Sequence, residues 1–224
     1  FAMRFSMKEE IIQTSLKQFL KHGIREMSIQ KLIEPLGIST KTVYKYFKNK
    51  EELLEEALNL YHAQRYRNLD QLSAEGDVIP LFFDIWYTSV EVTYKINKAF
   101  FTDLYYYYPE LGSKIEASSR IQYHKRFMRI IQRGIDQGVF EKDINVEVIL
   151  ESILVLFTSI IRDEKYKTFH LSPYNIFLNT IAVYIRGFCT ARGIGELNDY
   201  IRTYKTLGKD VQAKKKMAAT LPQQ

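Results

Sequence analysis

Residues 28–50 read SIQKLIEPLGISTKTVYKYFKNK, with apolar residues at helical spacing on both sides of Gly37. Ser28 stands directly before the first apolar run, and this position favours a helix N-cap because a hydroxyl can accept a bond from a free backbone N–H. The second helix is expected to start after Ser39. Gly37 supplies the backbone freedom that a tight turn requires. The stretch therefore predicts two short helices, about 28–36 and 40–47, joined by a turn, which is the pattern of a helix-turn-helix motif.

Two such short helices cannot bury their apolar sides alone, so the flanking segments must cover them. An apolar stripe over 8–21 predicts a helix before the motif, and another over 50–72 predicts a helix after it. The 224 residues include 10 Gly and 5 Pro, which is little material for hairpins, so we expect no sheet. Further helices are predicted over residues 79–97, 98–107, 110–137, 145–167 and 174–192.

The predicted fold class is all-α: a three-helix helix-turn-helix DNA-binding head joined to a helical-bundle body for dimerisation and ligand binding. We expect the head over residues 8–60 and the body over 61–204, with the clearest break in the apolar pattern at Ser73 to Asp77. Residues 205–224 are basic and polar, and we expect this tail to fray.

The local charge of the motif indicates DNA as its partner. Between Ser39 and Lys50 the chain has four lysines and no acidic residue, whereas its net charge is only +6 overall. The second helix of a helix-turn-helix enters the major groove, and its N-terminal half faces the base edges. Tyr44 and Tyr46 add phenolic donors suited to phosphate oxygens, which accept about half or more of protein–DNA hydrogen bonds. Double-stranded DNA is the predicted partner.

The segment TVYKYFKNKEEL, at residues 42–53, closely resembles the end of the DNA-binding domain of the TetR family. Three upstream segments stand at the family's spacing: Phe19-x3-Gly23, Met27-Ser28-Ile29-x2-Leu32-Ile33 and Gly37-Ile38-Ser39. The resemblance covers about residues 8–60. Beyond them only the number and lengths of the helices and the Gly134-x3-Gly138-x-Phe140 stretch are similar. The chain departs from the family at Glu34-Pro35-Leu36, and Pro35 is expected to shorten the first helix of the pair.

The resemblance implies particular roles in DNA binding. It places Thr40, Lys41, Thr42 and Lys45 near bases or the adjacent backbone, and Ser28, Tyr44, Tyr46 and Lys50 at phosphates. Three alternatives stay open at this point. Ser28 is an N-cap whether or not it touches DNA, and Lys48 is expected to be solvated. The third alternative is that part of the Tyr44 ring packs under the recognition helix, residues 40–47.

The same resemblance implies a homodimer through the 145–167 and 174–192 helices. The sequence favours this independently, because the 145–167 helix is apolar on more than one face and so must be covered on two sides. Gly187 and Ala191 would permit a close approach of the other helix. A central core helix in a monomer would show the same pattern, but a two-fold dimer doubles the length of DNA that is read.

The remaining helices would enclose a pocket for an unidentified small-molecule effector. The candidate lining residues are aromatic: Phe82, Phe83, Trp86, Tyr87, Phe101, Tyr105, Tyr123 and Phe127. Aromatic stripes at helical spacing are equally typical of a core without a pocket. The run Tyr105 to Tyr108 cannot bury all four rings in one place, because consecutive helical residues face different sides.

Catalysis is not indicated. The four histidines are scattered without a metal-binding spacing, and the sequence shows no glycine-rich phosphate loop. We therefore predict no enzyme, no cofactor and no metal. The single Cys189 fits the reducing cytoplasm, and no apolar run or leader indicates a membrane span or secretion.

The predicted function is a ligand-responsive DNA-binding transcriptional regulator, a repressor that binds a palindromic operator as a homodimer. The alternative is a helical interaction protein that keeps the head but binds a protein partner instead of an operator. An acidic substitution in the recognition helix would favour that alternative, and residues 40–47 contain none.

Overall fold

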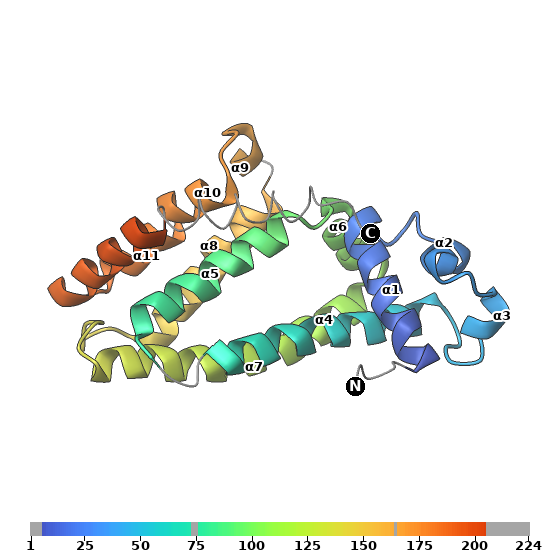
Figure 1. Ribbon diagram of the computed structural model, residues 1–224, viewed down its shortest axis with the longest axis horizontal. Helices are drawn as coiled ribbons and strands as arrows, with labels where there is room; N and C mark the ends of the chain where they lie inside the picture. Colours follow the sequence, from blue (N-terminus) through green and yellow to red (C-terminus); the bar gives the residue numbers. More distant parts are fainter. Residues whose placement is uncertain (1–5, 73–75, 164, 205–224) are drawn as a thin grey trace, which may run out of the picture. The chain divides into compact units, whose positions relative to one another are not determined.

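The computed structural model describes residues 6–72, 76–163 and 165–204, and its helices follow one another as Figure 1 shows. The labelled elements are α1 (Met7–His22), α2 (Ile29–Ile33), η1 (Glu34–Leu36), α3 (Thr40–Val43), α4 (Lys50–Leu72), α5 (Val78–Tyr94), α6 (Lys98–Tyr107), α7 (Pro109–Asp136), α8 (Val146–Arg162), α9 (Lys165–Thr168), α10 (Pro173–Asn179) and α11 (Ile181–Gly187). Residues 191–204 are also helical. Within the described ranges, β-pairing is limited to an isolated bridge between Phe140 and Cys189. The predicted all-α fold class is confirmed.

The chain forms two compact units. The first holds Phe1–Ala74 and Glu91–Phe127, and the second holds Glu75–Val90 and Met128–Gln224. The unit that contains the expected DNA-binding domain, residues 8–60, thus also takes in α6 and the first part of α7. The division into a DNA-binding head that ends at residue 60 and a ligand-binding body that ends at residue 204 stays a prediction. The tail after residue 204 and part of the break at residues 73–77 lie outside the described residues.

Helix α1 begins with a capping box. The Ser6 hydroxyl accepts a bond from the Glu9 backbone N–H, and the Glu9 carboxylate accepts one from the Ser6 backbone N–H at 2.8 Å. Its apolar side packs on α4 and α2 around the fully buried Phe19. The core of the first unit is built by α1, the helix-turn-helix, α4, α6 and the start of α7, with Leu32, Leu53 and Phe100 among its buried members.

The two α-helices of the helix-turn-helix motif are shorter than the sequence predicted. The first helix ends as an α-helix at Ile33 and continues as a single 3-10 turn through Pro35, because proline has no N–H to continue the α-helical bonds. Gly37 then takes the left-handed conformation at φ 62°. The second helix, expected over 40–47, is α-helical over Thr40–Val43 and continues into a hydrogen-bonded turn.

The second unit is packed largely by aromatic rings. Phe82 meets Phe140 and Phe188 edge to face, with centroids 5.6 and 6.1 Å away. Gly134 lies against the Phe140 ring so closely that a Cβ there would overlap it. The glycine that the sequence analysis noted in the Gly134-x3-Gly138-x-Phe140 stretch therefore makes room for a buried ring.

Two predicted long helices are interrupted. The 145–167 helix ends at Arg162 and is followed by the short α9. The 174–192 helix is divided into α10 and α11 at Thr180, whose Oγ1 donates to the Ile176 carbonyl at 2.6 Å. A hydroxyl bonded four residues back competes with the helical backbone pattern and bends helices. Of the helices that the structure describes, none is long and apolar enough to cross a membrane.

Candidate nucleic-acid interface

The predicted base-reading residues lie on one exposed segment. Thr40, Lys41 and Lys45 are exposed, and Thr42 is half-buried. Two buried side chains, Val43 and Phe47, fix this segment on the core. The Ser39 hydroxyl caps α3 by accepting from the Thr42 N–H at 3.3 Å. The local fold thus turns the polar and basic side chains outward and the apolar ones inward.

The two tyrosines of the segment also face solvent. Tyr44 is 56% exposed and Tyr46 is 40% exposed. The centroid of the Tyr46 ring lies 6.5 Å from that of the Phe47 ring, and the two rings are tilted relative to each other. More than half of Tyr44 is accessible, so at most part of its ring packs under the helix. A phosphate contact from either phenol stays a prediction.

Ser28 caps α2 by accepting from the Lys31 N–H at 3.3 Å, and its side chain is exposed. Its structural role is therefore clear from the geometry, as the sequence indicated. The exposed hydroxyl at the start of α2 is compatible with a DNA contact as well, and that contact stays a prediction.

Lys50 is placed differently from the expected phosphate ligand. Its Nζ donates to the carbonyl oxygens of Ile24 at 2.5 Å and Arg25 at 3.5 Å, and its side chain is half-buried. Burial lowers the pKa of Lys50, while the charges of Asp103 and Glu26 raise it. A phosphate contact from Lys50 would therefore have to compete with a backbone carbonyl that already holds the ammonium, and it stays a prediction.

The N-terminus of α4 is capped by its own side chains. The Asn49 Oδ1 accepts from the Glu52 N–H at 2.9 Å, and the Glu52 carboxylate accepts from the Lys48 N–H at 2.6 Å. The lysine-rich strip seen in the sequence is thus bordered by a carboxylate that folds back onto it.

The eight aromatic pocket candidates fall into both compact units. Phe82, Phe83, Trp86 and Tyr87 belong to the second unit, and Phe101, Tyr105, Tyr123 and Phe127 belong to the first. The rings of the first group pack locally, for example Phe83 on Phe177 with centroids 4.8 Å apart. Tyr105 is 36% exposed, and its hydroxyl donates to the Glu116 carboxylate at 3.2 Å. A pocket lined by these rings stays a prediction.

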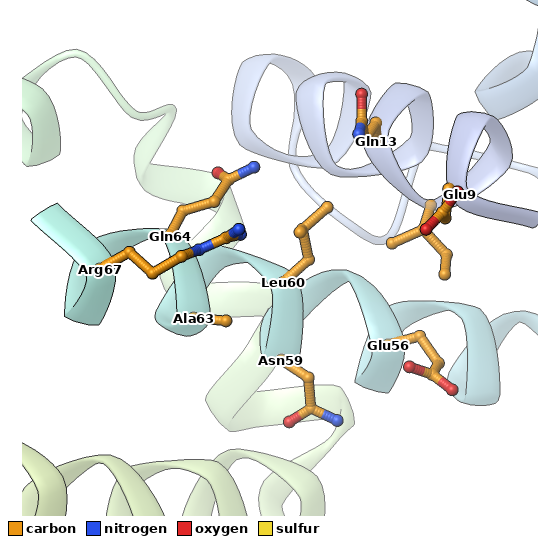
Figure 2. Close-up of a pocket in the computed structure, with 9 residues that line it drawn as sticks. Glu9, Gln13, Glu56, Asn59, Leu60, Ala63, Gln64 and Arg67 are labelled. Atoms are coloured by element: carbon orange, nitrogen blue, oxygen red, sulfur yellow. The ribbon is translucent and has the colours of Figure 1, made fainter. Parts of the chain in front are cut away.

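Two surface grooves are lined by other residues. The first, of about 510 Å³, lies between α1 and α4, with Glu9 and Glu56 toward one end and Gln64 and Arg67 toward the other, as Figure 2 shows. The second, of about 550 Å³, is lined by α8, α9, α10 and the residues between them, including Phe169 and Tyr166. None of the eight candidate rings lines either of these two grooves.

A buried polar cluster in the first unit was missed by the sequence analysis. Arg65 donates from Nε to the Tyr123 hydroxyl and from Nη1 to the Tyr61 hydroxyl, each at 3.1 Å, and lies 3.5 Å from the Thr93 hydroxyl. The only signal in the sequence is the four-residue spacing of Tyr61 and Arg65, which places them on one face of a helix. Burial raises the pKa of Tyr123 to about 12, although the charge of Arg65 opposes this shift.

His62 lies beside this cluster among aromatic rings. Its ring is 5.3 Å from that of Tyr61, and its Nδ1 is buried without a hydrogen-bond partner in the described structure. Burial lowers the pKa of His62 to about 4, and the positive charge of Arg65 adds to the effect. The imidazole is therefore neutral at physiological pH.

The stability of the protein should depend on pH through His62. An unfolded histidine has a pKa of about 6.5, so the unfolded chain binds the proton first as the pH falls. The stabilisation from a neutral His62 is fully present above that pH and is lost as the pH falls toward about 4. We expect wild type to lose about 2 kcal/mol more than His62→Phe between pH 7 and pH 5, measured by urea unfolding. Equal losses in the two proteins would contradict the shifted pKa.

The fold and the exposed segment define a class of protein, a helical regulator that carries a helix-turn-helix DNA-binding unit near its N-terminus. Residues 11–57 match the family model described as bacterial regulatory proteins, tetR family. The resemblance of the DNA-binding head to the TetR family is thus confirmed over these residues.

Among curated proteins, the chain is similar to the HTH-type transcriptional repressor KstR2 of Mycolicibacterium smegmatis. The two are 23% identical over 158 residues, which is 66% of this chain and 74% of that protein. The chain is also 43% identical over 54 residues to the uncharacterized HTH-type transcriptional regulator YerO of Bacillus subtilis, but this match spans 24% of the chain and 19% of YerO. The stronger local identity is thus confined to a short segment.

Solved structures extend the likeness of the fold to most of the chain. A TetR transcription regulator from Haloarcula marismortui has a TM-score of 0.65 at 19% identity, covering 82% of this chain and 98% of that one. The fatty acid degradation regulator FadR from Bacillus halodurans has a TM-score of 0.61 at 16% identity, covering 82% and 94%. At these identities the likeness shows a shared fold.

Proposed function

We propose that the protein is a ligand-responsive repressor that binds a palindromic operator as a homodimer in the cytoplasm. The observation that carries the proposal is the exposed segment Thr40 to Tyr46, polar and basic throughout its outer side and fixed on the core by two buried residues. Repression is the direction taken from KstR2, which is a repressor by name. The alternative of a protein-binding head is less favoured, because this outer side carries no acidic residue.

In the proposed complex, Thr40, Lys41, Thr42 and Lys45 approach base edges or the adjacent backbone in the major groove. Ser28, Tyr44 and Tyr46 contact phosphates through exposed hydroxyl groups. Lys50 takes part in phosphate binding only if its ammonium leaves the Ile24 carbonyl, so its larger contribution is to hold the start of α4.

The homodimer is supported by exposed apolar side chains on the predicted dimer helices. Val148 and Val155 lie seven residues apart on one face of α8 and are 58% and 68% exposed, and Val183 on α11 is 54% exposed. Apolar residues that protrude together on one face are typical of an interface. A second copy of the chain would cover them and place two heads about 34–36 Å apart, one turn of DNA.

Replacing Val155 with glutamate should convert the proposed dimer into a monomer, because it would bury a charge at the two-fold interface. Sedimentation velocity would measure the mass. Ile121→Glu is the matched control, since Ile121 is 60% exposed on α7, outside the proposed interface. A Val155→Glu protein that sediments like wild type, or a wild type that is already monomeric, would overturn the assignment of α8 to the dimer.

The effector site is proposed among the buried aromatic and polar side chains of the helices that follow the head. Tyr123 is the predicted pocket residue with the strongest support, because it belongs to the Arg65 cluster that combines phenols with a guanidinium. An effector that prefers one conformation of the body would change DNA affinity by its differential binding, typically about 1–3 kcal/mol.

Selection of binding sites from random double-stranded DNA tests the proposed function. We expect an enriched palindrome whose half-sites lie about one helical turn apart. An enriched single half-site would contradict the homodimer while retaining DNA binding. The absence of any enriched sequence would contradict the operator-binding function and favour the protein-binding alternative.

A further inference from the structure

Helix α6 holds the turn between α1 and α2 through a buried carboxylate. Asp103 is 8% exposed, and its Oδ2 accepts hydrogen bonds from the backbone N–H groups of Ile24 and Arg25, both at 2.7 Å. Hydrogen bonds to an ionised acceptor are shorter and stronger than neutral ones. The helix-turn-helix segment is therefore fixed by a residue that lies more than fifty positions after it.

The contact is reinforced at the beginning of α6. The Asn97 N–H donates to the Leu20 carbonyl at 2.9 Å, and the Asn97 Nδ2 donates to the Lys21 carbonyl at 3.1 Å. These bonds occupy carbonyls at the C-terminal end of α1, which have no partner within their own helix. The end of α1 and the start of α6 are thus joined by one backbone and one side-chain hydrogen bond from Asn97.

The backbone of Ile24 connects this contact to the start of α4. Its N–H is held by Asp103, and its carbonyl oxygen accepts from the Lys50 ammonium at 2.5 Å. Lys50 is the first residue of α4 and follows the exposed segment Thr40 to Tyr46, here called the recognition segment, by only a few residues. The buried Phe47 leaves little freedom between that segment and Lys50. A displacement of Ile24 would therefore move the beginning of α4 and the segment directly before it.

We infer that Asp103 is a positioning residue for DNA binding: it fixes the α1–α2 turn and, through the Ile24 peptide and Lys50, the presentation of the recognition segment. The inference rests on the proposed DNA-binding function. Asp103 touches no DNA in this role. It acts through the backbone of the helix-turn-helix unit, and its own helix lies outside residues 8–60.

Three variants test this role. Asp103→Ala removes the acceptor of the buried Ile24 N–H and of the partly buried Arg25 N–H. Asp103→Asn keeps an oxygen that can take the place of Oδ2 but removes the charge. Glu116→Gln is the control, because it removes a carboxylate of the same unit that bonds instead to the Tyr105 hydroxyl.

We expect Asp103→Ala to lower the affinity for the selected operator by about tenfold or more, Asp103→Asn to lower it less, and Glu116→Gln to leave it unchanged. The dependence of affinity on salt concentration should stay as in wild type, since no phosphate contact is removed. In the free proteins, hydrogen exchange of the Ile24 and Arg25 amides should be faster in Asp103→Ala than in wild type. This exchange measurement requires no DNA.

The inference is overturned if Asp103→Ala binds operator within twofold of wild type, or if its Ile24 and Arg25 amides exchange no faster. A wild type that selects no operator would instead refute the proposed function, and the exchange rates would still decide the contact. If Asp103→Ala does not fold by circular dichroism, Asp103→Asn decides. Wild-type affinity and exchange in that variant, together with the same salt dependence, would show that the charge of Asp103 positions nothing.

Discussion

Replacing Lys41 and Lys45 together with alanine should lower the affinity for operator DNA about a thousandfold at low salt, because each lost contact to a base or phosphate contributes about 1–3 kcal/mol. Both lysines are exposed on the recognition segment, and no acidic residue stands between Ser39 and Lys50. Two fewer released counterions should also reduce the slope of log affinity against log salt by about two.

Fluorescence anisotropy titrations with labelled operator, repeated at several salt concentrations, would measure both quantities. The matched control replaces Lys125 and Lys142, which are exposed elsewhere and remove the same formal charge. For this control we expect a slope of log affinity against log salt close to that of wild type. If the two double variants lose affinity equally, the effect comes from net charge alone, and the recognition segment is wrongly assigned.

Replacing Gly23 with alanine should lower the free energy of unfolding by about 4 kcal/mol, the sum of backbone strain and overpacking. Gly23 has φ 86° and ψ −176°, a region of backbone conformation that is essentially restricted to glycine. A Cβ at this position would lie 2.9 Å from the Ala99 Cβ and 3.0 Å from the Asp103 Oδ2. Neither neighbour can move easily, because both belong to the helix that holds the α1–α2 turn.

Gly37 provides the matched control for Gly23. It also has a positive φ, 62°, but a Cβ there would meet nothing within 4 Å. Gly37→Ala should therefore lose only the cost of the left-handed conformation, about 1–2 kcal/mol. Urea unfolding followed by circular dichroism would compare the two variants. Equal losses would show that contact with α6 does not constrain Gly23.

The sequence predicted the parts of the fold that depend on local patterns. Helical spacing of apolar residues predicted the all-α class. Ser28 caps the first helix of the motif, as expected, and the structure shows that Ser39 caps the second. Helix ends were less well predicted. Pro35 shortened the first helix, as expected of a residue without an N–H. The division at Thr180 accompanies a side-chain hydrogen bond that a periodic pattern does not encode.

By itself, the sequence determined the exposed recognition segment, because the order of polar, basic and apolar residues over one helical turn dictates which side is buried. Only the tertiary structure decided what the buried charged groups do. The sequence predicted Lys50 as a phosphate ligand, and the structure adds that its ammonium lies 2.5 Å from the Ile24 carbonyl oxygen. Asp103 gave no signal in the sequence, because its partners are backbone amides far away along the chain. Arg65 gave only its four-residue spacing from Tyr61, because its other partners also lie far away in the sequence. Such bonds form because burial removes water from the charged group and leaves nearby donors and acceptors to satisfy it.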